Sequence, residues 1–448
     1  MNRTRSSSAL LFLIGLGSVT QFHLVGSLGL SELPMFLLSP FIFILDYRRL
    51  SADGFAPFIW LLILTCFGCL ISSHVNDTPD IFLLKGLAHP YAMFSATVIF
   101  HRLLRNNFGG LKWFVIGAFL SGIISIFIFQ QETYTAGGGY LAEGTDAINR
   151  VMGYSLFWSG KIKEVLTLPV KAAYLSVPTA YSTGVGVFLV ALTMVISSGS
   201  GRSVALTILA STVLIAIARH SRLRMERIGK HIIIVGICTV VALGVLKAGY
   251  SFAAREGLLG YEAQRKYLKQ TRMGDSALKI LMAGRMEFFC GVMACLDHPI
   301  LGFGPKGEDT GGYVERYLRE YGAQEDYEHY VADVQWRKSR GELSYMGIPA
   351  HSYIGMFWIS YGIVGLLLWL YVLGMFFMYL RKYASAIPQW YGYVVLGLTA
   401  ESWHIFFSPF ASRFQLPLLI CCILFCKAVK KGKLTLPMDM EMEARKYE

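Results

Sequence analysis

The chain has 448 residues, of which 54% are hydrophobic and only 16% charged, and its formal net charge is +12. Its mean hydropathy is +0.49 because apolar runs long enough to cross a bilayer recur along its length. Transmembrane β-barrels alternate apolar and polar residues, and an open sheet leaves unpaired backbone groups in lipid. The sequence therefore predicts an all-α polytopic membrane protein.

The predicted crossings follow one another along the chain. Apolar segments lie at about 9 to 26, 31 to 46, 55 to 72, 81 to 100, 111 to 130, 183 to 198, 204 to 218, 231 to 248, 352 to 380, 390 to 407 and 414 to 426. The first begins with arginines, as signal peptides do, but no small-residue cleavage site follows, so we interpret it as a crossing. We predict one more crossing within Glu164–Ser182, a stretch broken by Pro169 and Pro178. The position of this crossing within that range stays open.

Basic residues occupy the short connections between these segments. They are Arg3, Arg5, Arg48, Arg49, Arg102, Arg105, the run from Arg219 to His231, Arg381, Lys382 and Lys427 to Lys433. Loops rich in Lys and Arg stay on the cytoplasmic side of a membrane. About twelve transmembrane helices satisfy this rule for every basic loop, and both termini are then cytoplasmic.

This topology divides the chain into four parts. They are an N-terminal transmembrane bundle of about nine crossings at 1–248, one large periplasmic loop at 249–350, C-terminal transmembrane helices at 351–432 and a cytoplasmic tail at 433–448. The loop has helix-like stretches near Tyr261–Lys269, Ser276–Leu296 and Tyr313–Tyr321, and we expect it to be folded. No internal repeat indicates the two halves of a transporter.

The cysteines and acidic clusters do not predict a metal site. Most cysteines lie in apolar segments as small hydrophobes. Cys290 and Cys295 lie in the loop, where an oxidising compartment would permit a disulfide although their helical spacing points them apart. We interpret Glu325–His329 as a solvated loop face and Asp439–Glu443 as a cytoplasmic segment, and we expect no metal and no cofactor.

Three residues at the predicted outer face suggest chemistry on a phosphorylated lipid. His351 stands at the mouth of a crossing, where a histidine with its ordinary pKa of about 6.5 can act as a general base. Arg202 and Arg285 can bind a diphosphate through two parallel hydrogen bonds each, and outer arginines run against the inside preference. The simpler alternatives are an interfacial histidine, a snorkelling Arg202 and a structural pair between Arg285 and Glu287.

Further polar residues near the outer ends of crossings suggest a pocket. Lys85 and His89 are four residues apart and therefore share one helix face, and polar groups at that depth commonly line a cavity. Glu401, His404 and Arg413 form a similar group, for which a buried Glu–Arg pair joining two helices is the alternative. No Walker loop, GxGxxG, HExxH or nucleophile elbow occurs, so ATP-driven transport and zinc proteolysis lose support.

Three segments resemble the O-antigen ligase and polysaccharide polymerase superfamily of bacterial inner membranes. SGSGRSVAL around Arg202 resembles its Ser-Arg element, Met282–Gly307 its Gly-Arg helix and Pro-x-x-Gly-x-Gly turn, and His351–Gly362 its histidine element. The resemblance implies a GT-C-like fold and a metal-independent glycosyltransferase of the cell inner membrane, with its active site on the periplasmic face. It also implies that His351 is the catalytic base and that Arg202 and Arg285 bind an undecaprenyl-diphosphate-linked glycan.

The acceptor implied by this resemblance is a hydroxyl of lipid A core or of a growing glycan, and no nucleic acid is involved. Ser352 and Ser360 stand where the family often has Asn and an acidic residue, so ligase and polymerase both stay open, with a slight preference for ligase. A transporter of lipid-linked glycan and a scaffold are the alternatives from other classes. The sugar, its linkage and the oligomeric state also stay open.

Overall fold

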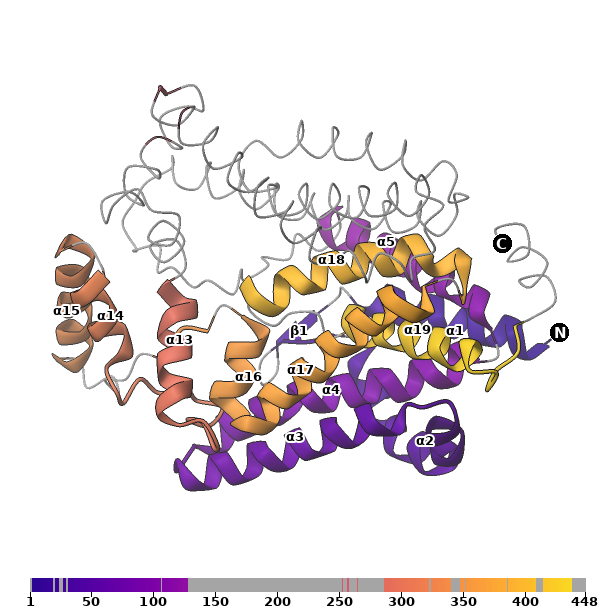
Figure 1. The fold of residues 1–448 in the computed structure, drawn as a ribbon, viewed down its shortest axis with the longest axis horizontal. Helices are drawn as coiled ribbons and strands as arrows, with labels where there is room; N and C mark the ends of the chain where they lie inside the picture. Colours follow the sequence, from indigo (N-terminus) through magenta and orange to yellow (C-terminus); the bar gives the residue numbers. More distant parts are fainter. Residues whose placement is uncertain are drawn as a thin grey trace.

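The computed structural model is built mainly of α-helices (Figure 1). The structure describes residues 2–18, 21–23, 27–29, 31–105, 107–127, 286–321, 324–339, 347–350, 352–384, 386–407 and 414–436, with isolated positions between 252 and 264. Within these ranges the prediction of a helical chain is confirmed, and the helical stretches Ala56–Val75 and Ile363–Tyr383 are long and apolar enough to cross a membrane. The crossings predicted between 128 and 248 lie outside the described residues.

Five helices are described before residue 128. They are α1 (Asn2–Ser18), α2 (Glu32–Ala52), α3 (Ala56–Val75), α4 (Asp80–Arg105) and α5 (Leu111–Phe127), with an antiparallel hairpin of β1 (Gln21–His23) and β2 (Ser27–Gly29) after α1 and a 3-10 turn, η1 (Phe108–Gly110), before α5. The predicted first crossing at 9–26 is wrong in its bounds, since α1 ends at Ser18. The glycines and polar residues that follow Ser18 favour turns over helix.

The second half adds the helices that carry the predicted loop and the last crossings. They are α13 (Met286–Asp297), α14 (Tyr313–Tyr321), α15 (Gln324–Ser339), α16 (Tyr353–Tyr361), α17 (Ile363–Met378), the π-helical turn η2 (Tyr379–Tyr383), the 3-10 turn η3 (Pro388–Trp390), α18 (Tyr391–Phe407) and α19 (Gln415–Lys430). The prediction of a helix at Tyr313–Tyr321 is confirmed. Glu325–His329, interpreted as a solvated face of the loop, lies in the helix α15, where Gln, Glu and Ala favour helix, and its residues Glu328 and His329 are exposed.

The segment predicted as one crossing at 352–380 is instead two helices. The chain breaks at Gly362, which ends α16 and precedes α17 and has a φ of +65°. Side chains with a Cβ rarely adopt this left-handed region. The apolar pattern continues through the glycine, and the sequence analysis therefore missed the break.

The core of the bundle is a continuous apolar cluster centred on α4 and α19. Nearly every α19 side chain from Leu416 to Cys426 is buried, and so are the α4 side chains from Ala92 to Phe100. Phe425 joins the elements, since its ring lies 5.1 Å from Phe55 and stacks on His101 at 5.5 Å. A helix segment that is buried on all sides belongs at the centre of a bundle, so these parts of α4 and α19 form the centre on which the other helices pack.

Apolar side chains on α2 and α3 point away from this core. The most exposed on α2 are Leu37, Phe41, Ile44 and Leu45, which are between 65% and 74% exposed. Water-soluble monomers rarely present so continuous an apolar surface. Together with the length of α3, this face is of the kind that lipid would cover.

Asp53, between α2 and α3, is the most deeply buried carboxylate of an ion-paired network. Its side chain is 1% exposed, its Oδ2 accepts a hydrogen bond from Arg105 Nε at 2.7 Å, and it lies 2.8 Å from His101 Nε2. Burial alone would raise the pKa of Asp53, but these two hydrogen bonds hold that pKa below its ordinary value. The ionised carboxylate thus stabilises the fold above its unfolded-state pKa, and this stabilisation is lost as pH falls through the lowered pKa.

Other polar contacts gather at the same end of the bundle. Arg102 Nη1 lies 2.8 Å from Asp46, Lys433 Nζ donates to the Ala52 carbonyl at 2.8 Å, and Asn107 Nδ2 donates to Ser8 Oγ at 2.8 Å. These contacts bring together the start of α1, the α2–α3 and α4–α5 connections and the segment after α19. We call this the basic end.

We predict that Asp53→Asn lowers the free energy of unfolding by roughly 3 kcal/mol, because it leaves the buried side of Arg105 and His101 without a carboxylate. Thermal unfolding of the purified chain in detergent at pH 7 measures the effect. Asp80→Asn, an exposed position at the start of α4, is the matched control. Equal melting temperatures for the two variants would contradict a structural role for the Asp53 network.

Candidate functional site

Helix α13 packs against α16, α14 against α13, and α15 against α14 (Figure 1), and a second, smaller core lies among them. Its buried members are Cys290, Ala294, Cys295, Phe303, Tyr313, Val314, Tyr317, Leu318, Ile348 and Ile359. The described part of the predicted loop is therefore folded, as expected. Cys290 and Cys295 carry free thiols, and burial raises the pKa of Cys295 to about 12, so this thiol stays protonated.

The start of α14 is fixed by two carboxylates. Asp309 is buried and accepts hydrogen bonds from the backbone N–H of Tyr313 at 2.7 Å and of Val314 at 2.9 Å, which caps the helix. The Tyr313 hydroxyl donates to Asp297 at the end of α13 at 2.9 Å. Burial, and then this carboxylate, raise the pKa of Tyr313 to about 12. These bonds hold α14 against α13.

The Gly-rich turn after α13 holds the junction of α16 and α17. We call residues 299–305 the clasp. The Phe303 N–H donates to the Ile359 carbonyl at 2.7 Å, and the Ile363 N–H donates to the Ile300 carbonyl at 2.9 Å. Trp358 Nε1 adds a bond to the Pro299 carbonyl at 2.9 Å. The clasp thus fixes the end of α13 to the break in the predicted crossing.

The clasp also contacts α3 and α4 from the N-terminal half of the chain. Ser72 Oγ donates to the Leu301 carbonyl at 2.5 Å, and Asn76 Nδ2 lies 3.4 Å from the Gly302 carbonyl. Gly86 admits Pro305, because a Cβ at Gly86 would lie 2.5 Å from the proline ring. The clasp therefore sits where α3 ends and α4 begins, at the end of these helices opposite to the basic end.

Two glycines make the clasp possible. Gly302 has a φ of +68° and Gly362 a φ of +65°. A Cβ at Gly302 would overlap the carbonyl oxygen of Ile359, and one at Gly362 would overlap that of Ile300. Each glycine is required both for its backbone conformation and for the close approach of the opposite chain.

The residues predicted to carry the chemistry, Arg202, Arg285, His351 and Arg413, lie outside the described residues. The structure describes the helices that follow two of them: α13 begins at Met286, and α16 begins at Tyr353. These helices pack against each other. A Cβ at Gly291 of α13 would lie 3.6 Å from both the Pro349 carbonyl oxygen and the Ile359 side chain.

Ser352 explains how α16 starts. Its side chain is buried, and its Oγ accepts a hydrogen bond from the Gly355 N–H at 3.0 Å, which makes Ser352 the N-cap of α16. Serine and asparagine are both favoured at this position. Ser352 therefore caps α16 in the way that an asparagine, common at this position in the superfamily that the sequence resembles, would cap it.

Lys85 and Lys306, the second of which the sequence analysis did not predict, both lie near the ring of Phe82. Lys85 Nζ lies 5.5 Å from the centroid of the Phe82 ring, and Lys306 Nζ, from the turn after the clasp, lies 5.8 Å from it. Lys306 also forms an ion pair with Glu308. The sequence does not predict the contact between Lys306 and Phe82, because the two residues are far apart along the chain. His89, half-buried, lies one turn after Lys85 on α4.

The first residue of α16 contacts the helix that carries Glu401. The Tyr353 ring stacks on His404 with centroids 5.9 Å apart and an interplanar angle of 14°. Glu401 is buried one turn earlier on α18. Two of the predicted polar residues of α18 thus lie near the start of α16, whereas their proposed partner Arg413 lies outside the described residues.

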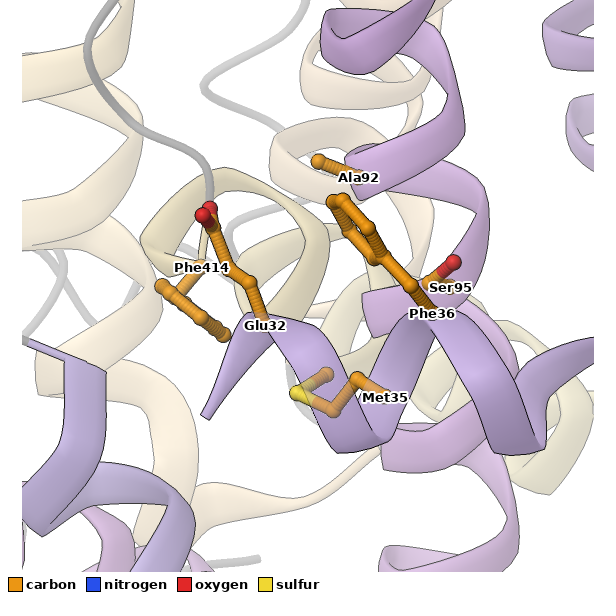
Figure 2. A pocket seen from close by; sticks show the side chains of 6 residues that line it. All are labelled: Glu32, Met35, Phe36, Ala92, Ser95 and Phe414. Atoms are coloured by element: carbon orange, nitrogen blue, oxygen red, sulfur yellow. The ribbon is translucent and has the colours of Figure 1, made fainter. Parts of the chain in front are cut away.

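A further buried carboxylate lies at the start of α2. Glu32 is 2% exposed and lines a narrow cavity with Met35, Phe36, Ala92, Ser95 and Phe414 (Figure 2). Figure 2 shows its carboxylate beside Phe414, the first described residue after Arg413. The sequence marks Glu32 only as an acid next to an apolar segment, and it was not predicted. This cavity is too narrow for a substrate.

Comparison with models of protein families and with curated proteins gave no match. Within the described part of the chain, no group of three or more His, Cys, Asp or Glu side chains is placed to hold a metal ion. The case for a function therefore rests on the residues themselves and on the packing of α13, α16 and the clasp.

We predict that Gly362→Ala disrupts the clasp, because the left-handed backbone costs about 1–2 kcal/mol and the new methyl group overlaps the Ile300 carbonyl. Limited proteolysis and thermal unfolding should show a loosened 286–350 segment and a lower melting temperature. Gly374→Ala in α17 is the control, since a Cβ there meets open space. If both variants behave like the wild type, the clasp is not a rigid contact.

Proposed function

We propose that the chain is a membrane glycosyltransferase of the O-antigen ligase type. It transfers glycan from an undecaprenyl-diphosphate carrier to an acceptor hydroxyl at the periplasmic face of the bacterial inner membrane. His351 is the catalytic base, and Arg202 and Arg285 bind the donor diphosphate. Lys85, His89 and Glu401 belong to the surrounding pocket, together with Arg413.

The packing of α13 against α16 is the observation that supports this proposal best. The helix that follows Arg285 lies against the helix that follows His351, and the clasp holds their C-terminal ends together. A transferase needs the cation that binds the diphosphate near the base that activates the acceptor. Two helices that are fixed against each other can hold the cation and the base at a constant separation.

The membrane placement is part of the proposal. About twelve transmembrane helices cross the inner membrane, the basic end faces the cytoplasm, and 249–350 is the periplasmic loop. The contacts among the basic connections support this orientation, because cytoplasmic loops carry most Lys and Arg. The exposed apolar face of α2 supports contact with lipid.

The proposed reaction follows from these groups. His351 takes the proton of the acceptor hydroxyl as its oxygen attacks the anomeric carbon of the donor sugar. The bond from that carbon to the diphosphate oxygen breaks, and the diphosphate leaves with the polyprenyl carrier. Arg202 and Arg285 stabilise the negative charge that develops on the leaving group. The reaction uses no nucleotide, in keeping with a compartment that lacks nucleotide sugars.

We predict that His351→Ala abolishes transfer and that Arg202→Lys and Arg285→Lys lower it by about tenfold or more, because lysine cannot reproduce a bidentate diphosphate contact. Transfer is measured with purified protein, lipid-linked glycan and acceptor. His329→Ala and Arg319→Lys, both at exposed positions of the loop helices, are matched controls. Near-normal transfer by all three site variants would reject the assignment, and movement of the donor across the bilayer without product would indicate a transporter.

Deletion of the gene separates ligase from polymerase. A ligase deletion should leave lipid A core without polymer while long polymer accumulates on its lipid carrier. We expect this result because the folded segment before His351 can receive a large acceptor beside the donor. Gel analysis of lipopolysaccharide and of carrier-linked glycan measures both pools. Single repeat units, on the carrier or on core, would instead make the chain a polymerase.

A further inference from the structure

Helices α1 and α5 cross at close range near the basic end. A Cβ at Gly15 would overlap the Phe114 carbonyl, and one at Gly117 would overlap the Phe12 carbonyl, so the two backbones touch. Beside this crossing lies a groove of about 610 Å³. It is lined by Arg5, Ser8, Ala9, Phe12, Leu13 and Trp113.

The lining has a helical period and a polarity gradient. Its five α1 residues stand at positions i, i+3, i+4, i+7 and i+8, which is one face of the helix. Arg5 is at the first turn, and Phe12 follows about 10 Å further along the axis. Leu13 and Trp113 are 57% and 40% exposed, so the groove is open to its surroundings. It is basic at one end and apolar along its length.

Two cations beside the groove have no acidic partner among the residues that the structure describes. Arg5 lines it, and Lys112 places its Nζ 5.8 Å from the centroid of the Trp113 ring. Neither forms an ion pair within the described part of the chain, whereas Arg102 and Arg105 at the same end pair with aspartates. Their charge is available to a bound anion.

We infer that this groove binds an anionic phospholipid of the cytoplasmic leaflet. The phosphate lies between Arg5 and Lys112, and an acyl chain runs along Phe12 and Leu13. Trp113 occupies the headgroup level, where tryptophan is enriched. The inference depends on the proposed membrane placement but not on the transfer reaction.

The lining favours this ligand over the other occupants of such a groove. A soluble phosphate would leave the apolar length of the groove uncovered. A zwitterionic lipid would gain little from two unpaired cations, whereas each Lys or Arg near an anionic membrane surface contributes about 1 kcal/mol, or roughly fivefold in affinity. An acidic headgroup with an acyl chain satisfies both parts.

Native mass spectrometry of the full-length, delipidated chain tests the inference. Phosphatidylglycerol and phosphatidylcholine with identical acyl chains are the probes. We expect phosphatidylglycerol to bind more tightly, and Arg5→Gln and Lys112→Gln each to weaken it by about fivefold while leaving phosphatidylcholine unchanged. Phe12→Ala should weaken both lipids. Arg381→Gln, an exposed basic residue of η2 outside the groove, is the control and should change neither.

Four results would overturn the inference. Equal binding of the two lipids would mean an ordinary lipid shell, and an equal effect of Arg381→Gln would mean a general charge effect. Competition by soluble glycerol phosphate would show that the headgroup alone accounts for binding, without the acyl chain. A dimer that Leu13→Arg dissociates would assign the groove to a second copy of the chain. None of these results depends on whether the protein transfers glycan.

Discussion

The clasp depends on backbone groups that a broken helix leaves without partners. The break at Gly362 deprives the last carbonyls of α16 and the first N–H groups of α17 of intrahelical bonds. The turn after α13 satisfies one of each, through Phe303 to the Ile359 carbonyl and through Ile363 to the Ile300 carbonyl. Because buried backbone groups must be paired, the break and the clasp require each other. The position of α13 beside α16 follows from this exchange.

The two ends of the bundle are held by different forces. At the clasp, main-chain hydrogen bonds and glycine contacts fix the elements to within the width of a methyl group. At the basic end, aspartates hold arginines and a histidine, and Asp53 depends on its ionised state. Backbone contacts do not titrate and are little screened by salt. The clasp, which fixes the end of α13 beside the end of α16, is therefore held by contacts that depend little on pH or ionic strength.

The helical class, the α14 bounds and the cysteine environments could be predicted because each depends on local pattern. The break at Gly362 could not, since the apolar run continues across it and its cause, the Ile300 carbonyl, is more than sixty residues away in sequence. The Lys306 contact with Phe82 and the Ser72 bond to Leu301 join residues more than two hundred positions apart. Of the predicted site and its pocket, the structure describes Lys85, His89, Glu401 and His404, so the roles of His351, Arg202 and Arg285 stay predictions.

Ser352 and Ser360, which differ from the pattern of the superfamily that the sequence resembles, have physical explanations in the fold. Ser352 caps α16, and Gly355 makes the cap possible, because a Cβ there would lie 2.5 Å from the serine oxygen. Ser360 is buried, and an acidic residue in its place would lose its hydration and need a partner. Helix capping thus explains Ser352, and burial explains Ser360. Neither serine therefore indicates which acceptor the proposed transferase uses.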